Sequence, residues 1–367
     1  MQAVVVHSLD EGAHLEEVEI DGPGPGEVLV RVVASGVCGS DLHVLDGTSP
    51  VLNLPMVLGH EGAGVVEAVG EDVRAVVPGD HVVIALYGPC LGCRNCLSGN
   101  LVHCNGDARI KAIRGTLPDG STHLSQRGVA VNPFVGSGTL AEYSLVRASQ
   151  VVVVPPDVPL EVICLAGCGV TTGLGAVFNI AHVQPGDAVA VIGCGGVGLS
   201  VVQGARIAGA TQIIAIDTNP AKLELAERMG ATHRLQSGAT PITEMVAELR
   251  PGGVDVAFEV VGRPELVAAA LAITRPGGSC VMVGSQPPGS VIPVDARVLA
   301  QERRLMGCIG GSNIPARDIP RIVDLYRSGE LRLDEMVTLR VTLAEFGEAF
   351  RALQAGEVAR SVVTMER

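Results

Sequence analysis

Short apolar runs separated by Gly and Pro dominate the first 90 residues of the chain. Val-rich runs of this length with turn residues at both ends are typical of β-strands. The tripeptide Pro78-Gly79-Asp80 marks a turn between two of them. The first part of the chain is therefore predicted to be mostly β. The strands expected here are 3–7, 27–34, 62–69 and 81–85.

From residue 188 onward, apolar runs of strand length alternate with segments of helical period. This alternation predicts a parallel, doubly wound sheet, because each helix returns the chain across the sheet. The expected strands are 188–192, 212–216, 254–260 and 279–284, and the expected helices are 199–208, 221–229 and 265–274. The tail adds helices near 318–328 and 343–354 and a strand at 361–365.

The segment 88–138 differs from both parts. It is rich in Cys, Gly and polar residues and shows little period. A segment of this length without elements of its own is usually functional, or is held by something other than an apolar core. We therefore expect it to carry a function or a stabilising group.

Composition narrows the class of protein. The length of 367 residues predicts two domains, and 47% hydrophobic with 18% charged residues indicates a globular chain. Aromatic residues make up only 2% of the chain, so Val, Ala and Gly must fill the core. The net charge is −13 without any basic block, which argues against nucleic acid as a partner.

Secretion and membrane insertion are also disfavoured. The first twelve residues lack a basic region followed by an apolar one, so no signal peptide is expected. Residues 162–181 carry no charge over a spanning length. Four glycines and the polar Thr171, Thr172 and Asn179 interrupt this stretch, so a buried segment is favoured over a spanning helix. We expect a cytoplasmic protein with no membrane partner.

A glycine motif of the form G-x-G-x-x-G follows the expected strand 188–192 and opens a helix. This context is the one that a dinucleotide site requires. The glycines permit a tight turn, a close approach of the pyrophosphate and close packing of helix on strand, and the helix N-terminus offers amide donors. A purely structural glycine turn is the alternative. The residues assigned to the cofactor are Gly193, Gly195, Gly196, Val197 and Gly198.

Asp217 stands at the end of the next expected strand. A carboxylate there accepts hydrogen bonds from a ribose 2′-hydroxyl and repels a 2′-phosphate, which favours NAD over NADP. Lys222 lies close by in the sequence and is a second candidate for the ribose. A solvated helix charge is the alternative for Lys222.

Four of the ten cysteines lie close together in the segment 88–138. Four thiolates at such spacing complete a tetrahedral zinc shell with no open position, which is a structural site. Zinc would then stabilise a segment that buries little apolar surface. An iron–sulfur cluster or free thiols are the alternatives. The residues are Cys90, Cys93, Cys96 and Cys104.

Three further candidate ligands are spread along the chain: Cys38, His60 and Cys168. Cys, His and Cys would leave zinc a fourth, open position for water or substrate. Each of them alone is weak evidence, because a lone buried Cys or His is more often a core residue.

The motifs together resemble the zinc-containing medium-chain alcohol dehydrogenases over nearly the whole chain. The motifs that carry this resemblance are C-G-S-D at 38–41, G-H-E-G-A-G at 59–64, P-G-D at 78–80, the four-cysteine lobe, G-C-G-V-T-T-G at 167–173 and the glycine motif. The resemblance implies a mostly-β GroES-like catalytic domain, 1–169 and 310–367, with a zinc lobe at 88–106. It also implies an NAD-binding Rossmann domain at 170–309 and a homodimer.

The resemblance assigns a catalytic zinc to Cys38, His60 and Cys168. This zinc acts as a Lewis acid on the alcohol oxygen, and the alcohol carbon delivers hydride to NAD. Ser40 is expected to take the alcohol proton and His43 to pass it to solvent.

The resemblance also bears on neighbouring residues. Asp41 is expected to hydrogen-bond His60, and Glu61 to serve as an alternative zinc ligand. A plain structural carboxylate is the alternative for both acids. Thr172, Val283 and Arg360 are assigned to the cofactor, Arg360 to its pyrophosphate, with a surface salt bridge as the alternative for Arg360.

Two departures from the family pattern affect these expectations. Gly39 stands where several relatives place a basic residue, so we expect looser cofactor binding. Leu86 replaces an aromatic residue, which indicates a wider substrate pocket.

Three functions remain open at this point. Reversible oxidation of a simple alcohol with NAD is favoured, because His43 is retained. Thiol-dependent oxidation of a formaldehyde adduct, or reduction of an S-nitrosothiol, is the second. A zinc- and NAD-binding protein without catalysis is the third.

Overall fold

The computed structural model describes residues 1–117 and 119–365. Contacts divide the chain into two compact units, Met1–Cys168 with Ile314–Arg367, and Gly169–Asn313. We expected boundaries after residues 169 and 309. Each unit has its own sheets and its own apolar clusters.

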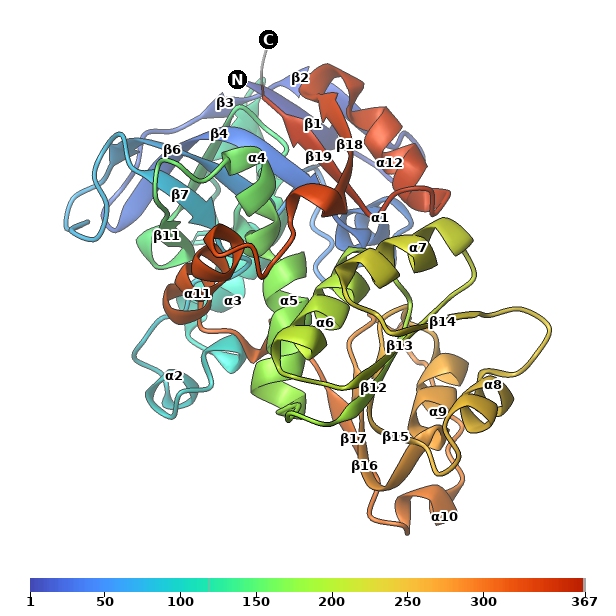
Figure 1. Cartoon of the computed structure of the whole chain (residues 1–367). Helices are drawn as coiled ribbons and strands as arrows, with labels where there is room; N and C mark the ends of the chain where they lie inside the picture. The colour runs from blue at the N-terminus through green and yellow to red at the C-terminus, as the bar shows by residue number, and fades with distance from the viewer. Residues whose placement is uncertain (118, 366–367) are drawn as a thin grey trace. The chain divides into compact units, whose positions relative to one another are not determined.

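The first unit is built on two mixed sheets, which are antiparallel except for the parallel pairs β5–β9 and β18–β19 (Figure 1). One sheet has the order β2-β1-β5-β9-β8-β3, and the other β11-β7-β6-β4-β19-β18, with β10 paired to β4. The strands are β1 Gln2–Val6, β2 Ala13–Glu17, β3 Glu19–Ile20, β4 Glu27–Val37, β5 Met56–Val57, β6 Glu61–Val69, β7 His81–Ile84, β8 Leu124–Gln126, β9 Val129–Pro133, β10 Tyr143–Arg147, β11 Val151–Val153, β18 Val337–Thr342 and β19 Arg360–Thr364. Its helices are α1 Gly39–Leu45, α2 Arg94–Leu97, α3 Asp107–Ile113, α4 Leu160–Ile163, α11 Pro315–Arg327 and α12 Phe346–Gln354.

The long strand β4 organises this unit, because it pairs with β6, β10 and β19. Its inward side chains are Val-rich and pack in a cluster with β6 and β7. Cys38 follows its C-terminal end, and Glu27 stands at its N-terminal end. The two ends of β4 therefore position two different regions of the molecule.

The second unit is a single parallel sheet of order β14-β13-β12-β15-β16-β17. α6 contacts α7 and α8 contacts α9, and these helices pack on the sheet (Figure 1). The expectation of a doubly wound Rossmann sheet is confirmed. The strands are β12 Ala188–Ile192, β13 Gln212–Asp217, β14 His233–Gln236, β15 Val254–Glu259, β16 Thr274–Met282 and β17 Arg304–Gly307. The helices are α5 Gly169–Gly175, α6 Gly196–Ile207, α7 Pro220–Met229, α8 Ile242–Leu249, α9 Pro264–Ala272 and α10 Ala296–Leu299.

Several elements were not predicted. β14, α8 and β17 were missed. β14 (His-Arg-Leu-Gln) and β17 (Arg-Leu-Met-Gly) are four residues long and hold only one and two large apolar residues. The segment 88–138 holds α2, α3, β8 and β9 where we expected little regular structure. Elements of three to seven residues are too short to show a hydrophobic period.

The uncharged stretch 162–181 is folded as several short helical pieces. Among the described residues no single helix has both the length and the hydropathy to cross a membrane. One broken pair, Leu160–Gly167 with Gly169–Ala181, meets that test by length and composition alone.

A partly buried ion pair joins the start of β4 to the segment before β8. His123 Nε2 lies 2.8 Å from Glu27 Oε1. The hydrogen bond with Glu27 raises the pKa of His123 above its usual 6.5. Burial alone would raise the pKa of Glu27, but the hydrogen bond and charge of His123 outweigh it and lower that pKa.

This pair makes stability depend on pH. A raised histidine pKa stabilises the fold below about pH 6.5, and this contribution is lost as pH rises through the folded pKa. A lowered glutamate pKa contributes above about pH 4.3 and is lost at lower pH. We expect His123→Gln to lower the melting temperature by about 2–4 °C near pH 6, and by less at pH 9. Equal losses at the two pH values would contradict this assignment.

Candidate metal centre and cofactor site

The structure brings Cys38, His60, Glu61 and Cys168 together in the first unit. One ligand atom from each of them lies within 4.8 Å of the others. Cys38 precedes α1, His60 comes directly before β6, Glu61 begins β6, and Cys168 follows a short 3-10 helix at the end of the unit. Three segments far apart in sequence therefore converge on one point.

Asp41 holds two of these segments in place. One of its carboxylate oxygens, Oδ2, accepts a hydrogen bond from the Cys38 amide at 2.9 Å and so caps α1. The other, Oδ1, accepts from the Gly59 amide at 3.0 Å and faces His60 Nδ1 at 3.4 Å. The contact that we predicted between Asp41 and His60 is therefore present, although it is long.

The His60 ring is oriented from two sides. Phe134 packs edge-on against it, with ring centroids 5.3 Å apart. Asp41 faces Nδ1, while Nε2 is fully buried and has no hydrogen-bond partner among the described residues. A buried polar nitrogen without a partner is costly unless something binds it. A metal ion in the cluster would supply that partner, with Asp41 fixing the tautomer.

Protonation in this cluster also fits a metal. The hydrogen bond with Cys168 is the main cause that lowers the pKa of Cys38 well below its usual 9.0. Burial alone would lower the pKa of His60, but the Asp41 carboxylate outweighs it and raises that pKa to about 10. Cys38 therefore offers a thiolate, whereas His60 gives up a proton when a metal ion binds.

Glu61 is fully buried and forms an ion pair with the Arg360 guanidinium, which is only 5% exposed. Gly36 makes room for this pair, because a Cβ at position 36 would collide with Glu61 Oε2 and Arg360 Nη2. Arg360 thus has a buried carboxylate partner and no surface salt bridge of the kind we weighed. Its contact with the pyrophosphate stays a prediction.

Two predicted proton carriers lie on α1. Ser40 Oγ is 4.0 Å from Cys38 Sγ, next to the cluster. His43 is one turn further along the helix and partly exposed, with Nδ1 3.0 Å from Thr48 Oγ1 and 3.5 Å from Asp46 Oδ2. Residues at this spacing share a helix face.

A second group of ligands is formed by Cys90, Cys93, Cys96 and Cys104. The Cys90 and Cys96 sulfurs are 4.0 Å apart, and those of Cys93 and Cys104 are 3.9 Å apart. Four sulfurs at this spacing fit a closed tetrahedral zinc site.

The cysteine thiols of the lobe differ in pKa when no metal is bound. Backbone hydrogen bonds, first that of Cys96, lower the pKa of Cys93 to about 6, whereas burial raises the pKa of Cys96 to about 12. A metal ion that enters the lobe must therefore displace at least one proton.

The lobe is also held by a residue that sequence reasoning missed. The buried Arg109 donates from Nη1 to the Cys104 carbonyl at 2.7 Å and from Nη2 to the Val102 carbonyl at 3.0 Å. Its guanidinium also lies 5.2 Å from the centre of the Tyr87 ring. A single arginine outside the cysteine motif gave no signal in the sequence.

The glycine motif forms the turn between β12 and α6 in the second unit. Gly193 has a φ of +96°, and Gly195 caps the N-terminus of α6. A Cβ on Gly198 would collide with the Gly193 carbonyl, so the third glycine permits the close packing that we predicted. The α6 amides are thus presented at the end of a buried parallel strand.

Asp217 stands at the end of β13 beside this turn. Its Oδ2 accepts from the Cys194 amide at 2.7 Å and its Oδ1 from the Asn219 amide at 2.9 Å. Lys222 lies in the first half of α7 and is half-buried. Val283 follows β16, with its amide bonded to the Glu259 carbonyl at 2.8 Å, and Thr172 lies within α5. The roles of these residues toward NAD stay predictions.

The fold and the two cysteine clusters define a zinc-dependent oxidoreductase. Residues 24–156 match the alcohol dehydrogenase GroES-like domain family, and residues 196–328 match the zinc-binding dehydrogenase family. The chain is 40% identical over 365 residues to S-(hydroxymethyl)glutathione dehydrogenase of Synechocystis sp., covering 99% of both. It is 37% identical to alcohol dehydrogenase class-3 of Myxine glutinosa, covering 99% of this chain and 97% of that relative.

A solved structure is also closely similar. Benzyl alcohol dehydrogenase from Acinetobacter calcoaceticus superposes with a TM-score of 0.94 at 34% identity, over 100% of this chain and 99% of that one. The chain belongs to the zinc-dependent medium-chain alcohol dehydrogenases, in their class III-like branch. The expected family, fold and cofactors, zinc and NAD, are thereby confirmed.

Proposed function

We propose that this zinc-dependent, NAD-linked alcohol dehydrogenase reversibly oxidises a simple alcohol to its aldehyde or ketone. The observation that carries the proposal is the buried cluster of Cys38, His60 and Cys168, in which His60 Nε2 lacks a partner. These three residues hold the catalytic zinc, which supplies a Lewis acid that makes the alcohol easier to deprotonate. NAD supplies the hydride acceptor.

The chain provides a path for the alcohol proton. Ser40, next to Cys38, accepts that proton at Oγ and is followed on the same helix by His43. His43 is partly exposed, so it connects this path to solvent. Its contact with Thr48 fixes the ring and leaves the other nitrogen to continue this path.

Two carboxylates lie beside the metal ligands and take no part in the transfer of the alcohol proton. Asp41 orients His60 through Nδ1. Glu61 is held beside the cluster by Arg360 and stands ready to replace a ligand. Arg360 thereby limits how far the Glu61 carboxylate reaches toward the metal.

Asp217 selects NAD, since its charge repels a 2′-phosphate. We expect Asp217→Asn to raise the KM for NAD about tenfold and to narrow the preference for NAD over NADP by at least as much. The control is Glu224→Gln, at an exposed position on α7. Steady-state kinetics with both cofactors measures the change, and an unaltered preference would remove Asp217 from this role.

An alcohol panel tests the substrate class. Turnover of primary alcohols, including benzyl alcohol, is measured with and without glutathione. Activity on free alcohols without the thiol supports the proposal. The names of several relatives favour a second candidate, a thiol–formaldehyde adduct. Activity that appears only with both thiol and formaldehyde would establish that candidate instead.

Two coarser features complete the proposal. We propose a homodimer and a cytoplasmic location, both of which rest on the resemblance to the family. Light scattering of the purified protein measures its oligomeric state.

A protein that binds NADH and zinc but reduces no aldehyde would favour the third function, that of a non-catalytic binding protein.

A further inference from the structure

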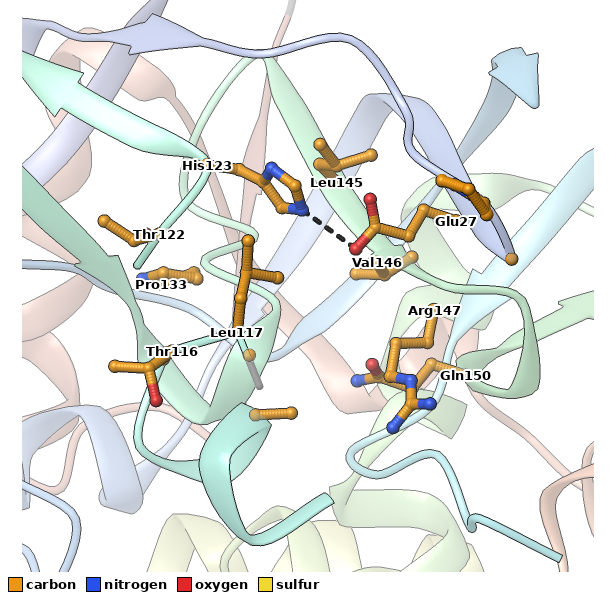
Figure 2. Close-up of a pocket in the computed structure, with 15 residues that line it drawn as sticks. Glu27, Thr116, Leu117, Thr122, His123, Pro133, Leu145, Val146, Arg147 and Gln150 are labelled. Carbon is orange, nitrogen blue, oxygen red and sulfur yellow. Dashed lines mark hydrogen bonds and ion pairs between the residues drawn. The ribbon is translucent and has the colours of Figure 1, made fainter. Parts of the chain in front are cut away.

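A cavity of about 200 Å³ lies within the first unit (Figure 2). None of its lining residues belongs to either ligand cluster. Glu27, at one end of β4, lines the cavity, whereas Cys38 follows the other end of that strand. The cavity is therefore separate from the catalytic metal site.

Arg147 brings to this cavity a positive charge that also interacts electrostatically with Glu27. It is the last residue of β10 and lies opposite Glu27 in the antiparallel pair. Its Nη1 atom is buried and has no hydrogen-bond partner in the part of the chain that the structure describes. A buried charged donor without an acceptor is costly, so the cavity lacks a group that accepts from Arg147.

Glu27 is not that acceptor, because both of its oxygens are engaged elsewhere. Oε1 pairs with His123 Nε2 at 2.8 Å, the contact drawn in Figure 2. Oε2 accepts from the Gly24 amide at 3.0 Å. His123 also offsets the charge of Glu27, which would otherwise repel an anion from the cavity.

The rest of the wall is part apolar and part polar. Leu117, Pro133 and Leu145 give the apolar part, and Thr116, Thr122 and Gln150 add polar groups (Figure 2). A dry cavity of about 150 Å³ is large enough for benzene. This cavity thus has room for one ring or a short chain beside the Arg147 guanidinium.

We propose that the cavity binds a small organic carboxylate, with its carboxylate on Arg147 and its apolar body against Leu117 and Leu145. An Arg–carboxylate pair is among the strongest hydrogen-bonded contacts in a protein, especially when partly desolvated. The apolar part of the wall distinguishes such a ligand from a plain inorganic anion.

Calorimetric titration of the zinc-loaded enzyme with benzoate tests this proposal. Arg147→Gln should weaken benzoate binding at least tenfold, while alcohol turnover stays unchanged. Arg340→Gln, on an exposed position of β18, is the matched control and should leave binding intact. Equal affinities of wild type and Arg147→Gln would overturn the proposal.

Benzoate can also bind a catalytic zinc, so the two sites must be separated. The Cys38→Ala variant removes the proposed catalytic zinc and should keep the benzoate site that depends on Arg147. Benzoate binding that disappears in Cys38→Ala but survives in Arg147→Gln would place the ligand on the metal and refute the cavity site.

Two further measurements examine the ligand class and the role of Arg147. Ala112→Leu should fill the cavity and abolish binding with Arg147 unchanged. Inorganic phosphate should bind at least tenfold more weakly than benzoate, and a phosphate affinity equal to that of benzoate would refute an organic ligand.

If Arg147 had a purely structural role, its replacement would lower the melting temperature of the protein. Our proposal expects Arg147→Gln to lose only the benzoate-induced rise in that temperature.

Discussion

Cys38→Ala should leave a folded protein with one zinc ion per chain and at least about 10³-fold less alcohol turnover. The Lewis acid contributes several kcal/mol to the reaction barrier, and each 1.36 kcal/mol corresponds to a factor of ten in rate. Folding should change little, because Cys38 contributes one cap interaction to a seven-residue helix. Metal analysis, melting temperature and turnover are measured on the same preparation.

Cys164→Ala is the matched control for this variant. Cys164 lies four residues before Cys168, is fully buried and is outside the ligand cluster. Burial raises its pKa to about 12, so it remains a thiol. The Cys164→Ala variant should therefore retain two zinc ions and full turnover. Two zinc ions in Cys38→Ala would show that Cys38 is not a ligand.

Cys93→Ala should lose much of its stability, whereas Cys38→Ala should lose turnover and keep its stability. It removes one of four sulfurs from a lobe whose helices are only three and four residues long. Such a segment buries little apolar surface, so zinc binding supplies its folding free energy. We expect a loss of about 3 kcal/mol or more, equivalent to about 6–12 °C in melting temperature.

The control for the lobe is Leu97→Ala, at a residue that is 76% exposed and next to Cys96. Its melting temperature should match that of the wild type. In Cys93→Ala, zinc content should fall to one ion per chain while the remaining folded fraction keeps its turnover per catalytic zinc. A normal melting temperature together with one zinc ion would mean that the lobe folds without metal.

Local patterns in the sequence determined the parallel sheet and the four-cysteine lobe, whereas the resemblance to a known family supplied the other set of candidate ligands. Strands buried on both faces are continuous apolar runs, so β12, β13 and β15 were predicted within one residue at each end. The glycine motif was equally clear, because φ values such as +96° at Gly193 strongly favour glycine. The spacing of Cys90, Cys93 and Cys96 predicted a metal lobe in the same local way.

Only the tertiary structure decided which distant residues meet. Arg360 pairs with Glu61, and Gly36 leaves them room, although these residues come from β19, β6 and β4. Phe134 orients the His60 ring from a segment more than seventy residues away.

The same holds for the cavity at Arg147, which depends on the register of β10 against β4. Register and packing are set by the sum of many weak contacts across the fold. No local period in the chain carries that information.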